Sequence, residues 1–129
     1  MKIAYLSFTG NVRSFVNRVD MDSVELDMSN PFIEMDEDFI VITPSYSNEL
    51  INVISEFVDY KDNIDHLVGF VGSGNKNWDI SYCFVAKDLA TKYNKPFIFD
   101  FELSGTENDI REFKKEVESI AIARATKES

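Results

Sequence analysis

Hydrophobic residues along the chain alternate between short continuous runs and wider, helical spacing. The continuous runs are residues 3–6, 24–26, 39–42, 67–71 and 97–101. Short apolar runs bounded by polar residues predict β-strands, so the pattern predicts five of them. The run at residues 39–42 is apolar at every position, which is typical of a strand covered on both faces.

Between these runs, apolar residues recur three and four positions apart, which predicts amphipathic helices. The four sets are Val12, Phe15, Val16 and Val19; Leu50, Val53, Ile54, Phe57 and Val58; Tyr82, Val85, Ala86, Leu89, Ala90 and Tyr93; and Ile110, Phe113, Val117 and Ile120. Thr106 with Asp109 predicts a cap at the start of the last helix. We expect that helix to fray from about Arg124 onward.

Strands that alternate with helices predict an α/β fold, an open parallel sheet with helices on both faces. Right-handed crossovers favour a doubly wound sheet in the order 2-1-3-4-5. The stretch at residues 28–38 contains Pro31 and several acidic residues and leaves little room for a crossover helix. We therefore expect that helix to be missing or rudimentary, in a single domain over residues 1–129.

The charge balance bears on the class of partner. Thirteen basic against 23 acidic residues give a net charge of -10. Such a surface repels nucleic acid and anionic lipid, so we expect neither as a partner. It could steer the chain towards a basic patch on another protein, or simply keep it soluble.

Cysteine and hydropathy point to the compartment. Cys83 is the sole cysteine, which rules out an internal disulfide and suits a reducing environment. No window resembles a signal peptide or a membrane span, so we expect a cytoplasmic protein, and a monomer by default. Cys83 and the lone His66 lie apart in sequence, and we predict no metal centre.

The loop after the first strand is a candidate phosphate site, because ligands of such sheets bind beyond the carboxyl ends of the strands. It reads Ser7-Phe8-Thr9-Gly10-Asn11-Val12. Hydroxyls, a glycine and the free amides of a helix start can cradle a phosphate. There is no lysine as in a Walker loop, so a phosphomonoester fits best. The alternative is a tight turn with a hydroxyl cap.

Two further loops fall at the same edge of the predicted sheet. After the third strand, Pro44-Ser45-Tyr46-Ser47-Asn48 offers Tyr46 to stack on a planar ring, although such a tyrosine can be ordinary surface. After the fourth strand, Ser73-Gly74-Asn75-Lys76-Asn77-Trp78 follows Gly72 and offers close backbone approach, amides and an aromatic face. The alternative there is a turn before a core tryptophan. A phosphoacceptor domain would need acidic residues where Ser7 and Thr43 stand.

These motifs resemble those of one protein family. The stretch Ser-Phe-Thr-Gly-Asn-Val at residues 7–12 resembles the flavodoxin phosphate loop. Gly-Ser-Gly-Asn-Lys-Asn-Trp at residues 72–78 and Phe-Glu-Leu-Ser-Gly-Thr at residues 101–106 resemble the signatures of the NrdI flavoproteins. The similarity runs from residue 1 to about residue 122. The resemblance implies a flavodoxin-like fold.

The resemblance also implies a cofactor and a partner. One FMN would be bound non-covalently, and the partner would be the small subunit of class Ib ribonucleotide reductase. The reduced flavin, recharged by a separate reductant, would react with dioxygen to give superoxide or peroxide. That oxidant would oxidise a dimanganese centre in the partner and generate a tyrosyl radical. The chain would thus act as an activase for the reductase.

The implied FMN site covers the three loops. Its residues are Ser7, Phe8, Thr9, Gly10, Asn11, Val12, Pro44, Ser45, Tyr46, Ser47, Asn48, Ser73, Gly74, Asn75, Asn77 and Trp78. Residues 102–106 would border the site or the partner interface, and Lys76 could face a reduced flavin.

The sequence departs from the family at residues 44–49. Family members usually carry glycines there, in a peptide that flips on flavin reduction, whereas this stretch has none. Asn48 tolerates positive φ best, so we expect a costlier flip. Two alternatives stay open: an electron-transfer flavodoxin for another redox partner, and a flavin-free interaction module.

Overall fold

The computed structural model describes residues 1–76 and 82–128. Its elements are β1 (Lys2–Tyr5), α1 (Asn11–Val19), β2 (Ser23–Glu25), β3 (Phe39–Thr43), α2 (Glu49–Val58), α3 (Asn63–His66), β4 (Leu67–Gly74), α4 (Phe84–Tyr93), β5 (Phe97–Glu102) and α5 (Glu107–Glu128). The five strands form one parallel sheet in the order β2-β1-β3-β4-β5. The predicted fold class and strand order are confirmed.

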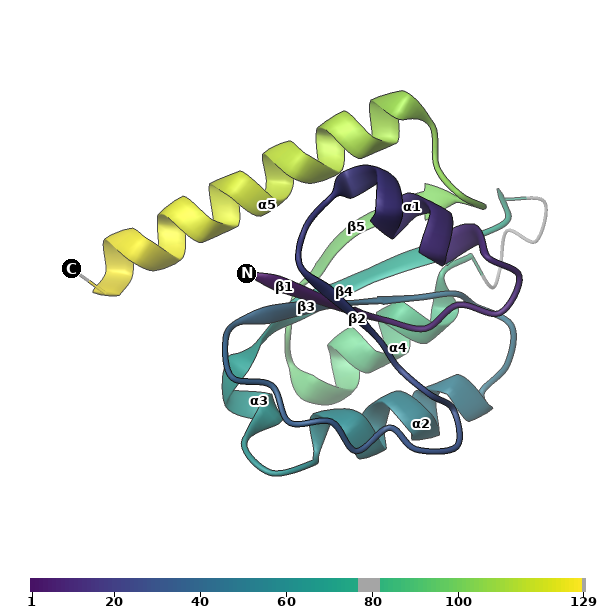
Figure 1. Ribbon diagram of the computed structural model, residues 1–129, viewed down its shortest axis with the longest axis horizontal. Helices are drawn as coiled ribbons and strands as arrows, with labels where there is room; N and C mark the ends of the chain where they lie inside the picture. The colour runs from purple at the N-terminus through teal and green to yellow at the C-terminus, as the bar shows by residue number, and fades with distance from the viewer. Residues whose placement is uncertain (77–81, 129) are drawn as a thin grey trace.

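The helices cover the two faces of the sheet, α1 and α5 on one side and α2, α3 and α4 on the other (Figure 1). The side chains of β3 contribute alternately to the core on each face of the sheet, because successive residues of a strand point to opposite faces. Phe39 and Val41 pack with α2 and α4, whereas Ile40 and Ile42 pack with α1 and α5. β3 is buried at every position, as its continuous apolar run predicts.

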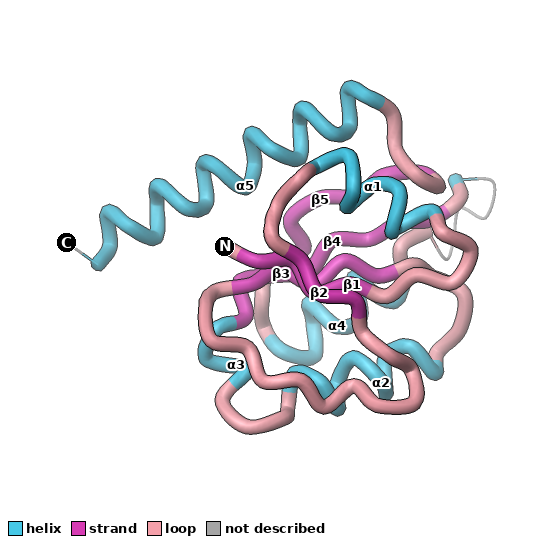
Figure 2. Tube along the Cα trace, in the orientation of Figure 1, coloured by secondary structure: helices cyan, strands magenta, loops and turns pink. Residues whose placement is uncertain are grey.

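The connection from β2 to β3 contains no helix, as predicted. It runs as a loop on the α2 side of the sheet (Figure 2). Leu26 and Met35 insert into the core there. The buried Asn63 fixes the rest of the loop: its side chain accepts the Met35 N–H at 2.8 Å and donates to the Ile33 carbonyl at 2.8 Å.

Two local expectations need correction. The last helix does not fray at Arg124, and α5 continues to Glu128, because Arg124 makes a 2.9 Å ion pair with Asp38. Tyr82 lies in a turn, so α4 begins later than its apolar spacing suggested, with the buried Cys83 at its N-cap. His66 ends α3, just before β4, and its Nδ1 lies 3.8 Å from an Asp38 oxygen.

The predicted cap of α5 is confirmed. Thr106 donates its N–H to Asp109 at 2.8 Å, and Asp109 donates its N–H to the Thr106 hydroxyl at 3.1 Å. Across the described residues, no helix combines the length and apolar character that a membrane crossing needs.

Candidate functional site

The carboxyl ends of β1, β3 and β4 meet at one edge of the sheet, where a small hollow of about 90 Å³ opens. Its lining consists of Asn11, Pro44, Ser45, Tyr46, Ser73, Gly74, Asn75 and Leu103. All but Leu103 belong to the three loops that the sequence singled out. The structure therefore brings those loops together around one space.

The start of α1 forms one end of this region. Gly10 is the N-cap residue, with φ 91° and ψ -4°, and nothing lies within 4 Å of the place where a Cβ would stand. Its backbone conformation therefore explains the glycine better than lack of space does. The first amides of α1 have no acceptor inside the helix, although Arg13 donates its N–H to the Ser7 hydroxyl at 3.2 Å. Val12 is buried in the core and can offer a ligand only its backbone.

Tyr46 is held between the first and third loops. Its hydroxyl lies 2.9 Å from the Thr9 hydroxyl, and its ring centroid lies 5.9 Å from that of Phe8 in an edge-on contact. Both rings are about half exposed. A second, apolar groove lies on the other side of Tyr46, where Met28 and Leu50 join the lining. Tyr46 therefore lines both the hollow and this groove.

Ser45 carries the most unusual polar group of the site. Its hydroxyl oxygen is buried and has no hydrogen-bond partner among the described residues. Ser45 lines the hollow next to Tyr46. Burying a hydroxyl without a partner costs free energy, so a ligand atom in the hollow would give this group the bond it lacks.

Ser47 and Asn48, also predicted site residues, are not among the residues that line the hollow. The Ser47 hydroxyl accepts the Glu49 N–H at 3.1 Å, and Asn48 is the N-cap of α2 with φ -61° and ψ -22°. None of the residues 44–49 has a positive φ. This glycine-free loop therefore adopts a backbone that ordinary residues reach without strain.

The glycines at the end of β4 also have a packing role that the sequence did not indicate. A Cβ on Gly74 would lie 2.9 Å from a ring carbon of Tyr82, and one on Gly72 would lie 2.7 Å from the Cβ of Cys83. They leave room for the turn before α4, and Gly74 also lines the hollow. Lys76 places its ammonium 5.7 Å from the centre of the Tyr82 ring. The predicted Asn77 and Trp78 lie outside the described residues.

Sequence reasoning missed Leu103 as an individual residue and named only the range 102–106. Leu103 has φ 53° and is half exposed at the hollow. The Ser73 hydroxyl donates to its carbonyl at 2.6 Å, and its N–H donates to the Gly74 carbonyl at 2.9 Å. A leucine in the sequence gives no signal of a left-handed backbone, which only the tertiary contacts impose.

Two neighbouring groups in the turn before α4, Tyr82 and Cys83, have raised pKa values. Burial raises the pKa of the Cys83 thiol to about 12, and the Asp100 carboxylate adds to this effect. Burial and a 2.9 Å hydrogen bond to Asp100 raise the pKa of the Tyr82 hydroxyl far above its usual value. Cys83 is thus not a nucleophilic thiolate at neutral pH. The described part of the chain also contains no group of three His, Cys, Asp or Glu side chains that could hold a metal ion.

Comparison with known proteins gives the family. Residues 3–115 match the family described as NrdI Flavodoxin like. This chain belongs to the NrdI flavodoxin-like family. That membership confirms the resemblance noted in the sequence, and it bears out FMN as the expected cofactor.

Solved structures support the same fold. A short-chain flavodoxin associated with a PDU bacterial microcompartment is similar, with a TM-score of 0.65 and 18% identity, over 95% of this chain and 96% of that one. A flavodoxin variant from Fusobacterium nucleatum, bound to flavin mononucleotide, has a TM-score of 0.52 and 20% identity, over 75% of this chain and 66% of that one. At these identities the likeness concerns the fold.

Proposed function

We propose that this NrdI-family chain binds FMN in the hollow and, when reduced, supplies superoxide or peroxide to the dimanganese small subunit of class Ib ribonucleotide reductase. The bound flavin supplies the electrons: one reduces dioxygen to superoxide, and two with two protons give hydrogen peroxide. The observation that carries the FMN site is the buried, partnerless hydroxyl of Ser45 beside Tyr46. Family membership supports the choice of partner.

The phosphate of FMN would lie at the start of α1. The helix dipole and the first amides of α1 favour an anion there, next to the Thr9 hydroxyl. Ser7 accepts a backbone N–H and keeps its own hydrogen free to donate. Arg13 takes no part, because its guanidinium is bound to Glu25 at 2.7 and 2.9 Å. Backbone geometry rather than a basic side chain would hold the phosphate.

The flavin ring would lie against Tyr46 and Pro44. Tyr46 offers an aromatic face whose orientation is fixed by Thr9 and Phe8. Ser45 offers a hydroxyl for a ring heteroatom, and the end of β4 closes the hollow from the other strand. Phe8, Tyr46 and Leu103 are half exposed in this region, and a partner protein could cover this apolar rim.

A second candidate is an electron-transfer flavodoxin that serves another redox enzyme. The similar structure over 95% of this chain is described as a short-chain flavodoxin, and the shared fold raises this alternative. The two functions differ in chemistry, because an activase must react with dioxygen whereas a carrier must deliver its electrons to a protein. Oxygen reactivity therefore separates them.

The test is a visible spectrum of the purified protein with FMN, followed by anaerobic reduction and readmission of air. We expect an FMN spectrum that bleaches and recovers rapidly in air, with superoxide or peroxide recovered in proportion. Slow reoxidation without a released oxidant would favour the electron carrier. Failure to bind FMN would contradict both functions.

Two variants sharpen this test. Gly10→Ala places a side chain at φ 91° in the phosphate loop, so we expect weaker FMN binding. Asp20→Ala is the matched control, because Asp20 has φ 58° at the opposite end of α1. The control should keep its affinity for FMN, and equal losses in the two variants would show that the effect is one of helix stability.

A further inference from the structure

Leu103 combines two costly features at one position. Its φ of 53° lies in the left-handed region, which costs a leucine free energy. The residue is also 50% exposed and lines the hollow, although exposing a leucine to water is unfavourable. Because both features are unfavourable, we ask which contacts hold Leu103 in this position.

The surrounding structure holds the Leu103 backbone in this conformation. Ser73 and Gly74 bind its carbonyl and its N–H, at 2.6 and 2.9 Å. Arg18 on α1 then fixes the following turn, because its guanidinium donates to the carbonyls of Ser104 and Gly105. The turn is thus tied to β4 on one side and to α1 on the other. The Leu103 side chain has no freedom to leave the hollow by a shift of its backbone.

The other non-glycine residues with positive φ have ordinary explanations. Asp20 and Asn94 are short polar residues at helix C-caps, where the left-handed conformation is common. Cys83 is an N-cap buried in the core, and Lys61 lies in the turn between α2 and α3. Among the described residues with positive φ, only Leu103 places a large aliphatic side chain in the candidate site.

We propose that Leu103 is a binding residue that forms an aliphatic wall for the FMN ring. This inference rests on the proposed FMN site. The strained backbone fixes the side chain against the ring and excludes water from that part of it, so the apolar contact contributes to affinity. Position 103 would then be occupied by leucine at the expense of the stability of the apoprotein.

We expect substitutions of Leu103 to weaken FMN binding without lowering the stability of the apoprotein. Leu103→Gly removes both the strain and the wall, and Leu103→Asn keeps a residue that tolerates positive φ but is polar. We expect each apoprotein to unfold at the same or a higher urea concentration than the original chain. We expect each to bind FMN about tenfold more weakly, by quenching of flavin fluorescence.

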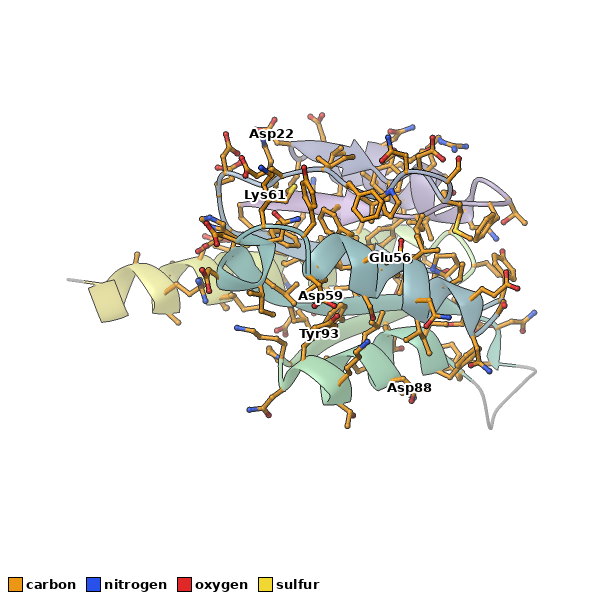
Figure 3. All side chains as sticks on the ribbon, turned by 90° about the horizontal axis from the view of Figure 1, so that it is seen from below. Asp22, Glu56, Asp59, Lys61, Asp88 and Tyr93 are labelled. Atoms are coloured by element: carbon orange, nitrogen blue, oxygen red, sulfur yellow. The ribbon has the colours of Figure 1, made fainter. Side chains whose placement is uncertain are left out.

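Lys61→Gly is the matched control. Lys61 has φ 49°, lies in the turn between α2 and α3 (Figure 3), and is not among the residues that line the hollow. This variant relieves a similar strain and should leave the dissociation constant for FMN unchanged. It separates the effect of the wall from a general effect of a more stable apoprotein.

The outcomes distinguish this inference from the function on which it rests. If the original chain binds FMN and Leu103→Gly binds it within twofold as tightly, the inference is wrong and the FMN site stands. If Leu103→Gly and Leu103→Asn both lower the stability of the apoprotein, Leu103 is a structural residue and the inference is also wrong. If the original chain binds no FMN, the proposed function and the inference fall together.

Discussion

The hydroxyl of Ser45 is buried without a partner, and this bears directly on how the apoprotein and the ligand-bound protein should differ. In the apoprotein the group has lost its water and gained no hydrogen bond, which is destabilising. A flavin heteroatom in the hollow would supply the missing bond. The same side chain should therefore oppose folding without FMN and favour binding with it.

Ser45→Ala tests this directly. We expect the apoprotein to become more stable by about 1 kcal/mol, because an unsatisfied hydroxyl is removed. We expect FMN to bind more weakly by a similar free energy, measured by flavin fluorescence alongside urea denaturation. Ser29→Ala is the control, since that hydroxyl bonds to Asp27 and does not line the hollow. Equal FMN affinity in the original chain and in Ser45→Ala would contradict the assignment.

Cys83 predicts an alkaline pH dependence. Its pKa is raised to about 12 from a usual 9.0, so the folded chain holds this proton more tightly than the unfolded chain. The resulting stability is fully present below pH 9 and is lost as the pH rises from 9 towards 12. Burial also raises the pKa of Tyr82 and of Tyr93, which acts in the same direction.

Cys83→Ala should flatten this dependence. In the original chain, ionisation of this thiol in the unfolded state lowers the free energy of unfolding. The decrease is up to about 1.4 kcal/mol for each pH unit above the pKa of the unfolded chain. The variant is expected to be less stable at pH 8 from lost packing, but its stability should fall less steeply up to pH 10. Urea denaturation at several pH values measures both slopes, and parallel slopes would refute the role of the thiol.

At the scale of elements, the loop between β2 and β3 stands where a doubly wound fold usually has a helix. Its backbone groups lack the internal bonds of a helix and must be bound from outside. Asn63 does this by accepting the Met35 N–H and donating to the carbonyls of Ile33 and Phe57, each at 2.8 Å. One buried side chain thereby joins the loop to the end of α2.

We therefore expect Asn63→Ala to destabilise the fold by roughly 3 kcal/mol, because it leaves several buried backbone groups without partners. Chemical denaturation measures the change. Asn108→Ala is a suitable control: that exposed amide makes a single 3.4 Å contact with Arg111, and its loss should change little. A small effect of Asn63→Ala would mean that packing of Leu26 and Met35 suffices to hold the loop.

How far the sequence predicts the structure varies between elements for physical reasons. The strand order and most helices follow from apolar spacing, because burial on one or two faces dictates that spacing. The extent of α5 depends on the ion pair between Arg124 and Asp38, which are distant in sequence. The bonds of Asn63 are likewise long-range. Neither could be found in a local pattern.

The candidate site was predictable only as far as the loops that form it. The sheet topology brings residues 7–12, 44–46 and 73–75 to one edge, which the strand order alone implies. The left-handed backbone of Leu103 was not predictable, because Ser73, Gly74 and Arg18 impose it from other elements. The packing of the β4 glycines against Cys83 and Tyr82 was not predictable either, because those contacts depend on where the turn before α4 lies.

At the scale of the whole molecule, acidic residues dominate the surface. The net charge of -10 creates a negative potential that attracts cations and repels anions. In the view of Figure 3, Glu56, Asp59 and Asp88 belong to the α2 and α4 side of the molecule. A protein partner or reductant with a basic surface is thus favoured in the encounter.

This charge predicts how fast small reductants act. The FMN-loaded chain should be reduced faster by a viologen radical cation than by dithionite-derived anions of similar driving force. The advantage should shrink as ionic strength rises from about 0.01 M to about 0.1 M, because the screening length falls from about 30 to about 10 Å. Stopped-flow absorbance measures both rates, and an advantage that does not depend on salt would contradict electrostatic steering.

The most direct test of the account is formation of the tyrosyl radical in a manganese-loaded class Ib small subunit, read by electron paramagnetic resonance. The reduced, FMN-loaded chain and dioxygen are added together, with dioxygen alone as the control. If the chain is an activase, a radical signal should rise with the amount of reduced chain and be absent in the control. A chain that binds FMN and consumes dioxygen, yet gives no radical above the control, would contradict it.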